Sequence, residues 1–211
     1  FGPNGLIACG VRSGPFIVSV SNMHTGTEVS RIPAGICVGP GNTLKSVAFS
    51  SNGKRLVLVD DYNPIAICSV THGKRLLDIG RRSDQPPDRS TPFRASTAVF
   101  TADGRTLVCC SAEGLFALDS LSVDARFQPS LNVCHSWCAG FTSEGQVILG
   151  ACGEFQRWEL GAGAEMISSE SVACSTPGCL SVSPDDSRIA LGVSDMHDTG
   201  VVMIRDLRTG R

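Results

Sequence analysis

The chain has 211 residues, of which 42% are apolar and 18% are charged, and its formal net charge is −2. This length allows one domain or two small ones, with a sizeable buried core. The composition excludes wholesale disorder, collagen and coiled coil, and the charge gives no reason to expect nucleic acid or an anionic membrane as a partner.

A hairpin pattern recurs along the chain: an apolar strand, a short polar turn and a second apolar strand. The first copy lacks its leading strand and begins at Pro3-Asn4-Gly5, followed by Leu6–Gly10. Asn-Gly and Asp-Gly turns supply positive φ at low cost and are the strongest short-range hairpin signal. The complete copies are, in chain order, Val47–Val59, Ala98–Cys110, Ala139–Gly150 and Leu180–Gly192.

Each hairpin is followed by a third apolar segment, and most by a weaker fourth, which predicts four short strands per unit. The third segments are Phe16–Val20, Ile65–Val70, Leu115–Leu118, Phe155–Leu160 and Val201–Leu207. The fourth segments are Glu28–Ile32, Arg75–Ile79, Ala125–Gln128 and Ala164–Ile167. The turn positions Gly5, Gly53, Gly104, Gly145 and Asp186 are separated by 48, 51, 41 and 41 residues.

The second strand of the hairpin is apolar on successive residues, as in Leu56–Val59. Such a strand is expected to be buried on both faces, as in a sheet stacked between two similar sheets. A two-layer sandwich would instead show a cleaner alternation of apolar and polar residues.

Four strands every ~40–45 residues is the blade period of a β-propeller, and at this point the chain resembles the WD-repeat family. In that family the third strand ends in Trp-Asp. The last unit is the nearest match: Asp206 corresponds to the Asp, whereas Arg205 replaces the Trp. The resemblance also implies a buried network of His, Ser/Thr, Asp and Trp, for which His135 alone lies near the His position. The other units carry Ser21-Asn22, Cys68-Ser69, Leu118-Asp119 and Trp158-Glu159 at this place.

We therefore predict an all-β fold, a β-propeller of four-stranded antiparallel blades with about five blade units. The first unit lacks its leading strand, the last lacks its trailing strand, and the sequence does not begin with Met. We expect an incomplete part of a larger ring, typically seven-bladed, and a compact five-blade ring is the alternative. The predicted units span about 1–33, 34–80, 95–130, 131–170 and 171–211, with a loop insertion at 80–94.

The chain has 10 cysteines, several of them inside apolar runs such as Leu107–Cys110. Neighbouring strand residues point to opposite faces, so Cys109 and Cys110 should not share one partner. We expect reduced, packed thiols in a cytoplasmic protein, with a nuclear location as the alternative. No apolar run approaches the ~20 residues that span a bilayer, and no signal peptide is visible.

Two groups of residues have the chemistry of metal ligands. Cys134-His135-x-x-Cys138 and Cys174-x₄-Cys179 suit zinc, because the first strands of successive units can be neighbours. We favour instead the burial of Cys138 and Cys179 at strand positions. In the second group, Asp195, His197 and Asp198, we favour an ordinary hydrated turn. No metal and no cofactor is therefore expected.

The candidate binding residues lie in loops, since loops on rigid scaffolds often carry function. The longest polar segment, Gly80–Pro92, is rich in arginine, and arginines clamp carboxylates or phosphates. A tolerated surface insertion is the alternative for this segment. The family resemblance implies contacts through loops that join second to third strands and loops that enter first strands. By position, the candidate partner-binding residues are Arg81, Arg82, Arg89, Arg94, Asp61, Tyr62 and His197.

The sequence has no Gly-x-Ser-x-Gly elbow, His-Glu-x-x-His motif or phosphate loop. The adjacent carboxylates Asp60-Asp61 and Asp185-Asp186 fall at predicted turns. We therefore expect no catalytic residues and a non-enzymatic protein–protein interaction scaffold, whose partners are proteins rather than nucleic acid or membrane. Two alternatives remain open: a metal-dependent propeller enzyme of the lactonase or hydrolase kind, and a structural subunit of a large ciliary or cytoskeletal assembly.

Overall fold

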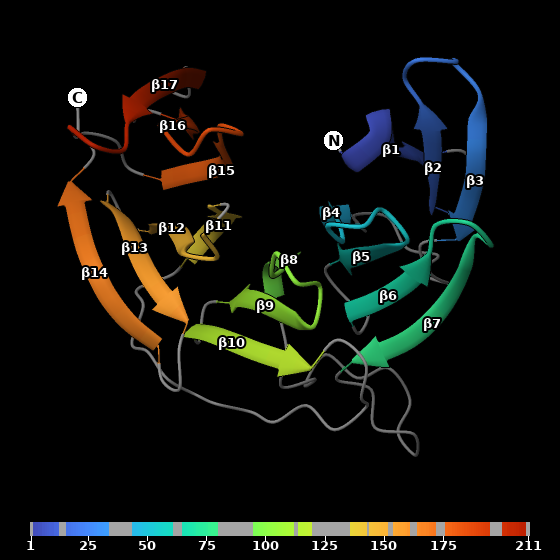
Figure 1. The fold of residues 1–211 in the computed structure, drawn as a ribbon, viewed down its shortest axis with the longest axis horizontal. Coiled ribbons are helices and arrows are strands. Elements are labelled where there is room, and N and C mark those ends of the chain that lie inside the picture. The colour runs from blue at the N-terminus through green and yellow to red at the C-terminus, as the bar shows by residue number, and fades with distance from the viewer. Residues whose placement is uncertain are drawn as a thin grey trace. The chain divides into compact units, whose positions relative to one another are not determined.

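The computed structural model describes the residues 2–12, 16–33, 44–60, 65–79, 95–111, 114–119, 136–142, 144–151, 154–160, 164–171, 176–194 and 200–209. Within these ranges the chain forms one short 3₁₀ helix, η1 (Pro3–Gly5), and otherwise strands and turns (Figure 1). The described part of the chain contains no helix long and apolar enough to cross a membrane. The strands are β1 (Leu6–Arg12), β2 (Phe16–Asn22), β3 (Glu28–Pro33), β4 (Leu44–Phe49), β5 (Arg55–Asp60), β6 (Ile65–Ser69), β7 (Lys74–Ile79), β8 (Ala95–Phe100), β9 (Thr106–Ser111), β10 (Gly114–Asp119), β11 (Ser136–Phe141), β12 (Val147–Ala151), β13 (Glu154–Leu160), β14 (Ala164–Ser171), β15 (Thr176–Val182), β16 (Arg188–Ser194) and β17 (Gly200–Asp206).

These strands form five sheets, in each of which strands that follow one another along the chain lie side by side. The first sheet is β1–β3, the second β4–β7, the third β8–β10, the fourth β11–β14 and the fifth β15–β17. The first, second, fourth and fifth sheets are antiparallel throughout. The predicted fourth segment Ala125–Gln128 lies outside the described residues. The predicted segment Ala164–Ile167 is a longer strand, β14, because its pairing with β13 continues to Ser171.

The chain divides into two compact units. One comprises residues 1–109 and 117–127, and the other comprises residues 110–116 and 128–211. The first unit holds the first and second sheets and most of the third, and the second unit holds the fourth and fifth sheets.

In the first unit, the second sheet is packed on both of its faces. Val18, Val20 and Ile32 of the first sheet form one buried cluster with Leu56 and Leu58 of β5. The third sheet lies on the other side, where β8 contacts β4 and β5. All of Leu56–Val59 are less than 4% exposed, so the predicted burial of both strand faces is confirmed. This stacking differs from a two-layer sandwich, in which one face of each sheet meets solvent.

In the second unit, the fourth and fifth sheets pack face to face. Ile148 and Phe155 of the fourth sheet cluster with Ile189, Leu191 and Val193 of the fifth. The approach of β11 to β15 is close at one glycine of β11. A Cβ on Gly140 would lie 2.6 Å from Leu180 Cδ2 and 3.0 Å from Val182 Cγ2, so a side chain at this position would force these neighbours to shift.

The predicted hairpin turns are present at one end of the sheets. Asn4 has φ 58° and Gly5 has φ 70°, and the same left-handed backbone recurs at Gly53, Gly104 and Gly145. In the fifth sheet a non-glycine residue, Asp186, takes this conformation with φ 54°. Asn, Asp and Gly tolerate positive φ, which is why these residues signalled turns in the sequence.

The cysteines divide into buried and exposed ones. Cys68, Cys109, Cys110 and Cys138 are buried, as predicted. The prediction that Cys179 is buried at a strand position is wrong: it lies in β15 but is exposed, and so is Cys9 of β1. Both face away from the neighbouring sheet of their own unit, which explains their exposure. Desolvation raises the pKa of the Cys68 thiol to about 11 and that of the Cys109 thiol further.

Candidate protein-interaction surface

The second sheet anchors most of the predicted partner-binding segments at a single end. Register pairs Leu44 with Asp60 and Ile65 with Ile79, so the start of β4, the end of β5, the start of β6 and the end of β7 lie together. The segment that carries Asp61 and Tyr62 connects β5 to β6. The arginine-rich segment leaves β7 after Ile79 and enters β8 at Ala95.

The start of β8 is fixed near the same end. Ser46 Oγ in β4 and Thr97 Oγ1 in β8 are 2.9 Å apart and share a hydrogen bond. Thr97 is buried, and buried hydroxyls that are hydrogen-bonded hold their strands in one relative position. The topology therefore brings both ends of the arginine-rich segment and the β5–β6 connection to one end of two packed sheets.

The seven predicted partner-binding residues all lie outside the described residues: Arg81, Arg82, Arg89, Arg94, Asp61, Tyr62 and His197. The structure places the strands that flank them and does not test their side chains. The segment of His197 connects β16 to β17 in the second unit. Their role in binding stays a prediction.

At the opposite ends of the sheets, each hairpin turn contains a hydrogen bond between one of its side-chain hydroxyls and one of its backbone N–H groups. In the turn between β4 and β5, Ser50 Oγ accepts a hydrogen bond from the Arg55 N–H at 3.0 Å. Thr101 Oγ1 does the same for Thr106 N–H, and Ser183 Oγ for Arg188 N–H. The fourth turn is one residue shorter, so Thr142 Oγ1 accepts instead from Gln146 N–H. Each turn is thus stabilised locally by a Ser or Thr that follows the first strand.

Hydroxyl groups in two of these turns also donate hydrogen bonds to the carboxylates of the turn. Ser183 Oγ donates to Asp185 Oδ1 at 2.6 Å, and Ser187 Oγ donates to Asp185 Oδ2 at 2.7 Å. These hydrogen bonds hold the pKa of the Asp185 carboxyl well below its usual range. Thr101 lowers the pKa of Asp103 in the same way. The prediction that Asp185 and Asp186 belong to a turn is confirmed, with Asp185 engaged in holding it together.

In three sheets, a polar residue at the end of the strand that leads into a turn accepts hydrogen bonds from that turn. Asn22 Oδ1 accepts hydrogen bonds from the N–H groups of His24 and Thr25. Asp206 Oδ1 accepts from the N–H groups of Arg208 and Thr209, and Ser69 Oγ accepts from His72 N–H. Each residue thereby closes the turn that follows the third strand. These three residues therefore have the same local role in the first, second and fifth sheets.

Trp158 is buried at 7% exposure in β13. Its Nε1–H donates to Gln156 Oε1 of the same strand at 3.2 Å. This bond satisfies the indole within the fourth sheet. The candidate His135 of the family network lies outside the described residues.

Among the described residues, no three His, Cys, Asp or Glu side chains gather as metal ligands would. Of the candidate zinc ligands, the described residues include only Cys138 and Cys179, which lie in β11 and β15. The remaining candidates, Cys134, His135, Cys174, Asp195, His197 and Asp198, fall outside the described ranges.

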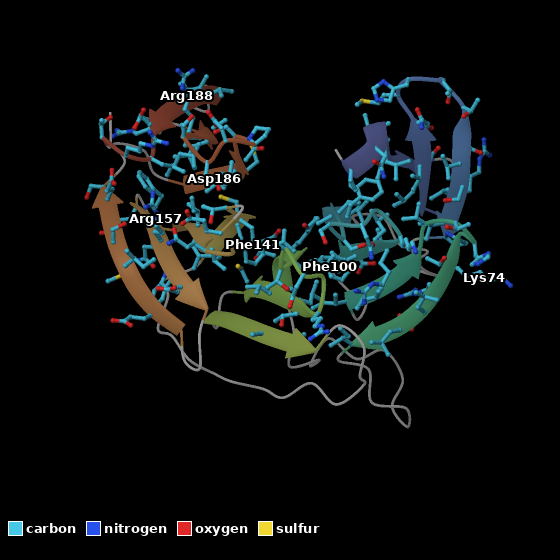
Figure 2. The ribbon with its side chains drawn as sticks, in the orientation of Figure 1. Lys74, Phe100, Phe141, Arg157, Asp186 and Arg188 are labelled. Carbon is cyan, nitrogen blue, oxygen red and sulfur yellow. The ribbon has the colours of Figure 1, made fainter. Side chains whose placement is uncertain are left out.

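Two arginines that the sequence analysis did not single out join neighbouring sheets. Arg55 of β5 hydrogen-bonds to the Gly104 carbonyl of the third sheet, and its guanidinium lies 5.2 Å from the Phe100 ring centroid. Arg157 of β13 donates from Nη2 to the Leu207 carbonyl beside the fifth sheet at 3.0 Å. Figure 2 labels Phe100 and Arg157. In the sequence, these two residues could have been noticed as single arginines within an apolar strand pattern, as in Arg55-Leu56 and Arg157-Trp158.

Comparisons with known proteins identify the fold. No protein-family model matches the chain, and no curated protein matches its sequence. The β-propeller domain of Myceliophteria thermophila Cps50 (Swd1) is similar to it, with a TM-score of 0.71 and 13% identity over 96% of this chain. Hydrazine synthase of Kuenenia stuttgartiensis is similar to it with a TM-score of 0.70 and 11% identity over 100% of this chain.

In both solved structures the matched part is 62% of the other chain, so this chain spans less than two thirds of either one. Likeness at such low identity shows the fold and nothing about activity. The antiparallel sheets, packed face to face within each unit, are propeller blades, and the chain has a β-propeller fold.

Proposed function

We propose that this chain is a non-enzymatic scaffold of the WD-repeat kind that binds a protein partner through loops at one end of its blades. The observation that carries the proposal is the geometry of the second sheet. This sheet is buried on both faces, and the segments with Asp61, Tyr62 and the four arginines all leave it, or enter the third sheet, at the same end.

A packed frame of this kind favours binding because the loop ends are fixed before a partner arrives. A ligand then orders fewer groups, and less of the interaction free energy is lost to conformational entropy. Arg81, Arg82, Arg89 and Arg94 outnumber the two carboxylates of the segment, Asp84 and Asp88, so the segment keeps a net charge of +2. Guanidinium groups form paired hydrogen bonds with carboxylates, so the partner surface that suits this segment is acidic.

The test is a charge reversal of the whole segment in the intact protein, with Arg81, Arg82, Arg89 and Arg94 each replaced by Glu. Partners are captured from cells by crosslinking and quantified against the wild type, and the main one is then purified and titrated. We expect binding to weaken by at least about tenfold, and to weaken in the wild type as salt is raised.

The matched control replaces four exposed basic residues at the turn ends of the blades: Lys54, Lys74, Arg105 and Arg208. This control carries the same change in net charge, so it removes general electrostatic attraction equally. We expect the control to retain the partner. Equal loss, or equal retention, in the two variants would contradict a binding role for the arginine-rich segment.

A further inference from the structure

The fifth sheet carries an apolar face that no described residue of the second unit covers. Val202 and Ile204 of β17 are 71% and 66% exposed, the two largest values among the exposed large apolar side chains. Val202 of β17 pairs with Gly192 of β16, which pairs on its other side with Cys179 of β15. In the same way, Ile204 pairs with Ala190, which pairs with Ser181. Residues directly opposite one another share a face. Val202, Ile204 and Cys179 therefore lie on one surface, which we call the outer face of the fifth sheet.

The other face of this sheet is occupied. Ile189, Leu191 and Val193 of β16 pack against Ile148 and Phe155 of the fourth sheet. Successive strand residues alternate between faces, so Ala190 and Gly192 point to the outer face. The fifth sheet therefore has one face in an inter-sheet core and one apolar face in solvent.

The same positions are buried in other blades. In the fifth sheet, Asp206 closes the turn that follows β17, and Ile204 and Val202 lie two and four residues before it. The same count from Asn22 gives Val20 and Val18, each 0% exposed in the cluster shared with the second sheet. From Ser69 it gives Ile67 and Ile65, each 1% exposed. The exposed pair thus occupies positions that elsewhere lie between two blades.

Two further positions repeat this contrast. Cys138 pairs with Gly150 in the fourth sheet, and Cys179 pairs with Gly192 at the equivalent place in the fifth. Cys138 lies next to the fifth sheet and is only 5% exposed, whereas Cys179 is exposed. Arg55 pairs with Ser69 as Arg188 pairs with Asp206. Arg55 binds a turn carbonyl and an aromatic ring of the next sheet. Arg188 is exposed and lies at the outer side of the fifth sheet (Figure 2).

We propose that the outer face of the fifth sheet is a docking surface for a further propeller blade, formed by a segment of the same polypeptide outside these 211 residues. The match covers 62% of each of the two solved chains, so each of those chains continues beyond the part that this chain resembles. The proposal continues an interface that the second unit already shows between its fourth and fifth sheets. It rests on the fold and the burial pattern, and is independent of the scaffold function proposed above.

The occupant is defined by what covers the equivalent positions elsewhere. It presents large aliphatic side chains from its second strand to Val202 and Ile204, as Ile189 and Leu191 do to Phe155. It also offers a backbone carbonyl in its hairpin turn to Arg188, as Gly104 does to Arg55. Burial of two large aliphatic side chains is a substantial gain for one interface.

The first experiment uses Cys179 as a natural probe in the intact, full-length protein. Native protein is labelled with a maleimide, and each cysteine is followed by mass spectrometry of its peptide. Thr25→Cys, in an exposed turn of the first sheet, is the reference for an open thiol. We expect Cys179 to react at least about tenfold more slowly than the reference. Equal rates would overturn the proposal.

The second experiment identifies the occupant. A benzoylphenylalanine photo-crosslinker replaces Val202 in the full-length protein, and the crosslinked peptides are sequenced. An adduct with a strand segment of the same polypeptide outside residues 1–211 supports the proposal. Adducts with residues 6–33, with a second copy of the chain or with a different protein each overturn it, as does the absence of any adduct.

The third experiment is a matched pair of variants. Val202→Asp with Ile204→Asp should lower the melting temperature of the full-length protein and make Cys179 reactive. Val29→Asp with Leu76→Asp places the same charges at apolar residues that are 42% and 58% exposed on the outer strands β3 and β7. We expect the control pair to change neither property. If the first pair fails to fold, the unsubstituted protein still decides the question through Cys179.

Discussion

The two units build the same inter-blade interface from different residues. In the first unit, Val18 and Val20 of the first sheet meet the second sheet, so the contact is aliphatic. In the second unit, Phe155 occupies the place of Val18, and Arg157 occupies the place of Val20. Gly140 makes room where β11 approaches β15. The fold thus fixes which positions face the next blade, while the side chains need only fill the space together.

This difference explains how the chain can share a fold with solved propellers at 11% and 13% identity while no family model matches it. Burial and strand register recur from blade to blade. The residue types at the recurring positions do not.

The largest effect is expected from Phe155→Ala, which empties the centre of the second unit's interface. Phe155 is 2% exposed, and truncation of a buried Phe costs about 3–5 kcal/mol of unfolding free energy. Chemical denaturation followed by far-UV circular dichroism measures the cost in either unit, and the fluorescence of Trp137 and Trp158 reports on the second unit alone, because both belong to it. Val18→Ala at the equivalent place of the first unit should cost less. An equal loss from both variants would contradict the comparison.

Gly140→Ala tests the close approach of β11 to β15. The added Cβ would meet Leu180 Cδ2 at 2.6 Å, and overpacking of this kind typically costs about 1–3 kcal/mol. Denaturation midpoints should therefore fall. Gly178→Ala in β15 is the control, because its Cβ would meet only the Gly192 carbonyl oxygen at 3.8 Å. A neutral Gly140→Ala would show that the two sheets separate easily.

Thr101→Val removes the hydroxyl that closes the turn between β8 and β9. The loss of the hydrogen bond from Thr106 N–H should cost about 1 kcal/mol. The variant should also lose part of the stability that depends on Asp103. The folded-state pKa of Asp103 is depressed, so its contribution is present above the unfolded pKa and disappears as pH falls through the folded value. Unfolding curves at pH 7 and pH 3 should therefore differ less in the variant than in the wild type.

The smallest effect concerns the Cys68 thiol in the first unit's core. Burial raises its pKa from 9.0 to about 11, so the unfolded chain loses this proton first as pH rises. Stability linked to Cys68 is complete below about pH 9 and falls between there and about pH 11, by about 1 kcal/mol at pH 10. Cys68→Ala should reduce the loss of stability between pH 8 and pH 10. A variant with the same pH dependence as the wild type would place the titration elsewhere.

Much of the architecture could be predicted because its signals are local. Asn4-Gly5 and Asp103-Gly104 mark turns through their tolerance of positive φ, and Leu56–Val59 indicates a strand between two neighbours. The exposure of Cys179 could not be predicted, since it depends on which side of the fifth sheet is covered. Arg55 and Arg157 carry no local sign of the carbonyls they bind, because those carbonyls belong to another sheet. The candidate binding residues lie outside the described residues, so their arrangement stays a prediction from the sequence.

The buried thiols lie between different pairs of sheets, so their alkylation can report the unfolding of each pair separately. Cys68 lies in the core between the first and second sheets, and Cys138 in β11 lies against the fifth sheet. As denaturant rises, each of these two thiols becomes alkylatable only when the pair of sheets that buries it separates. The order in which Cys68 and Cys138 react would therefore report which of the two units opens first, without any engineered label.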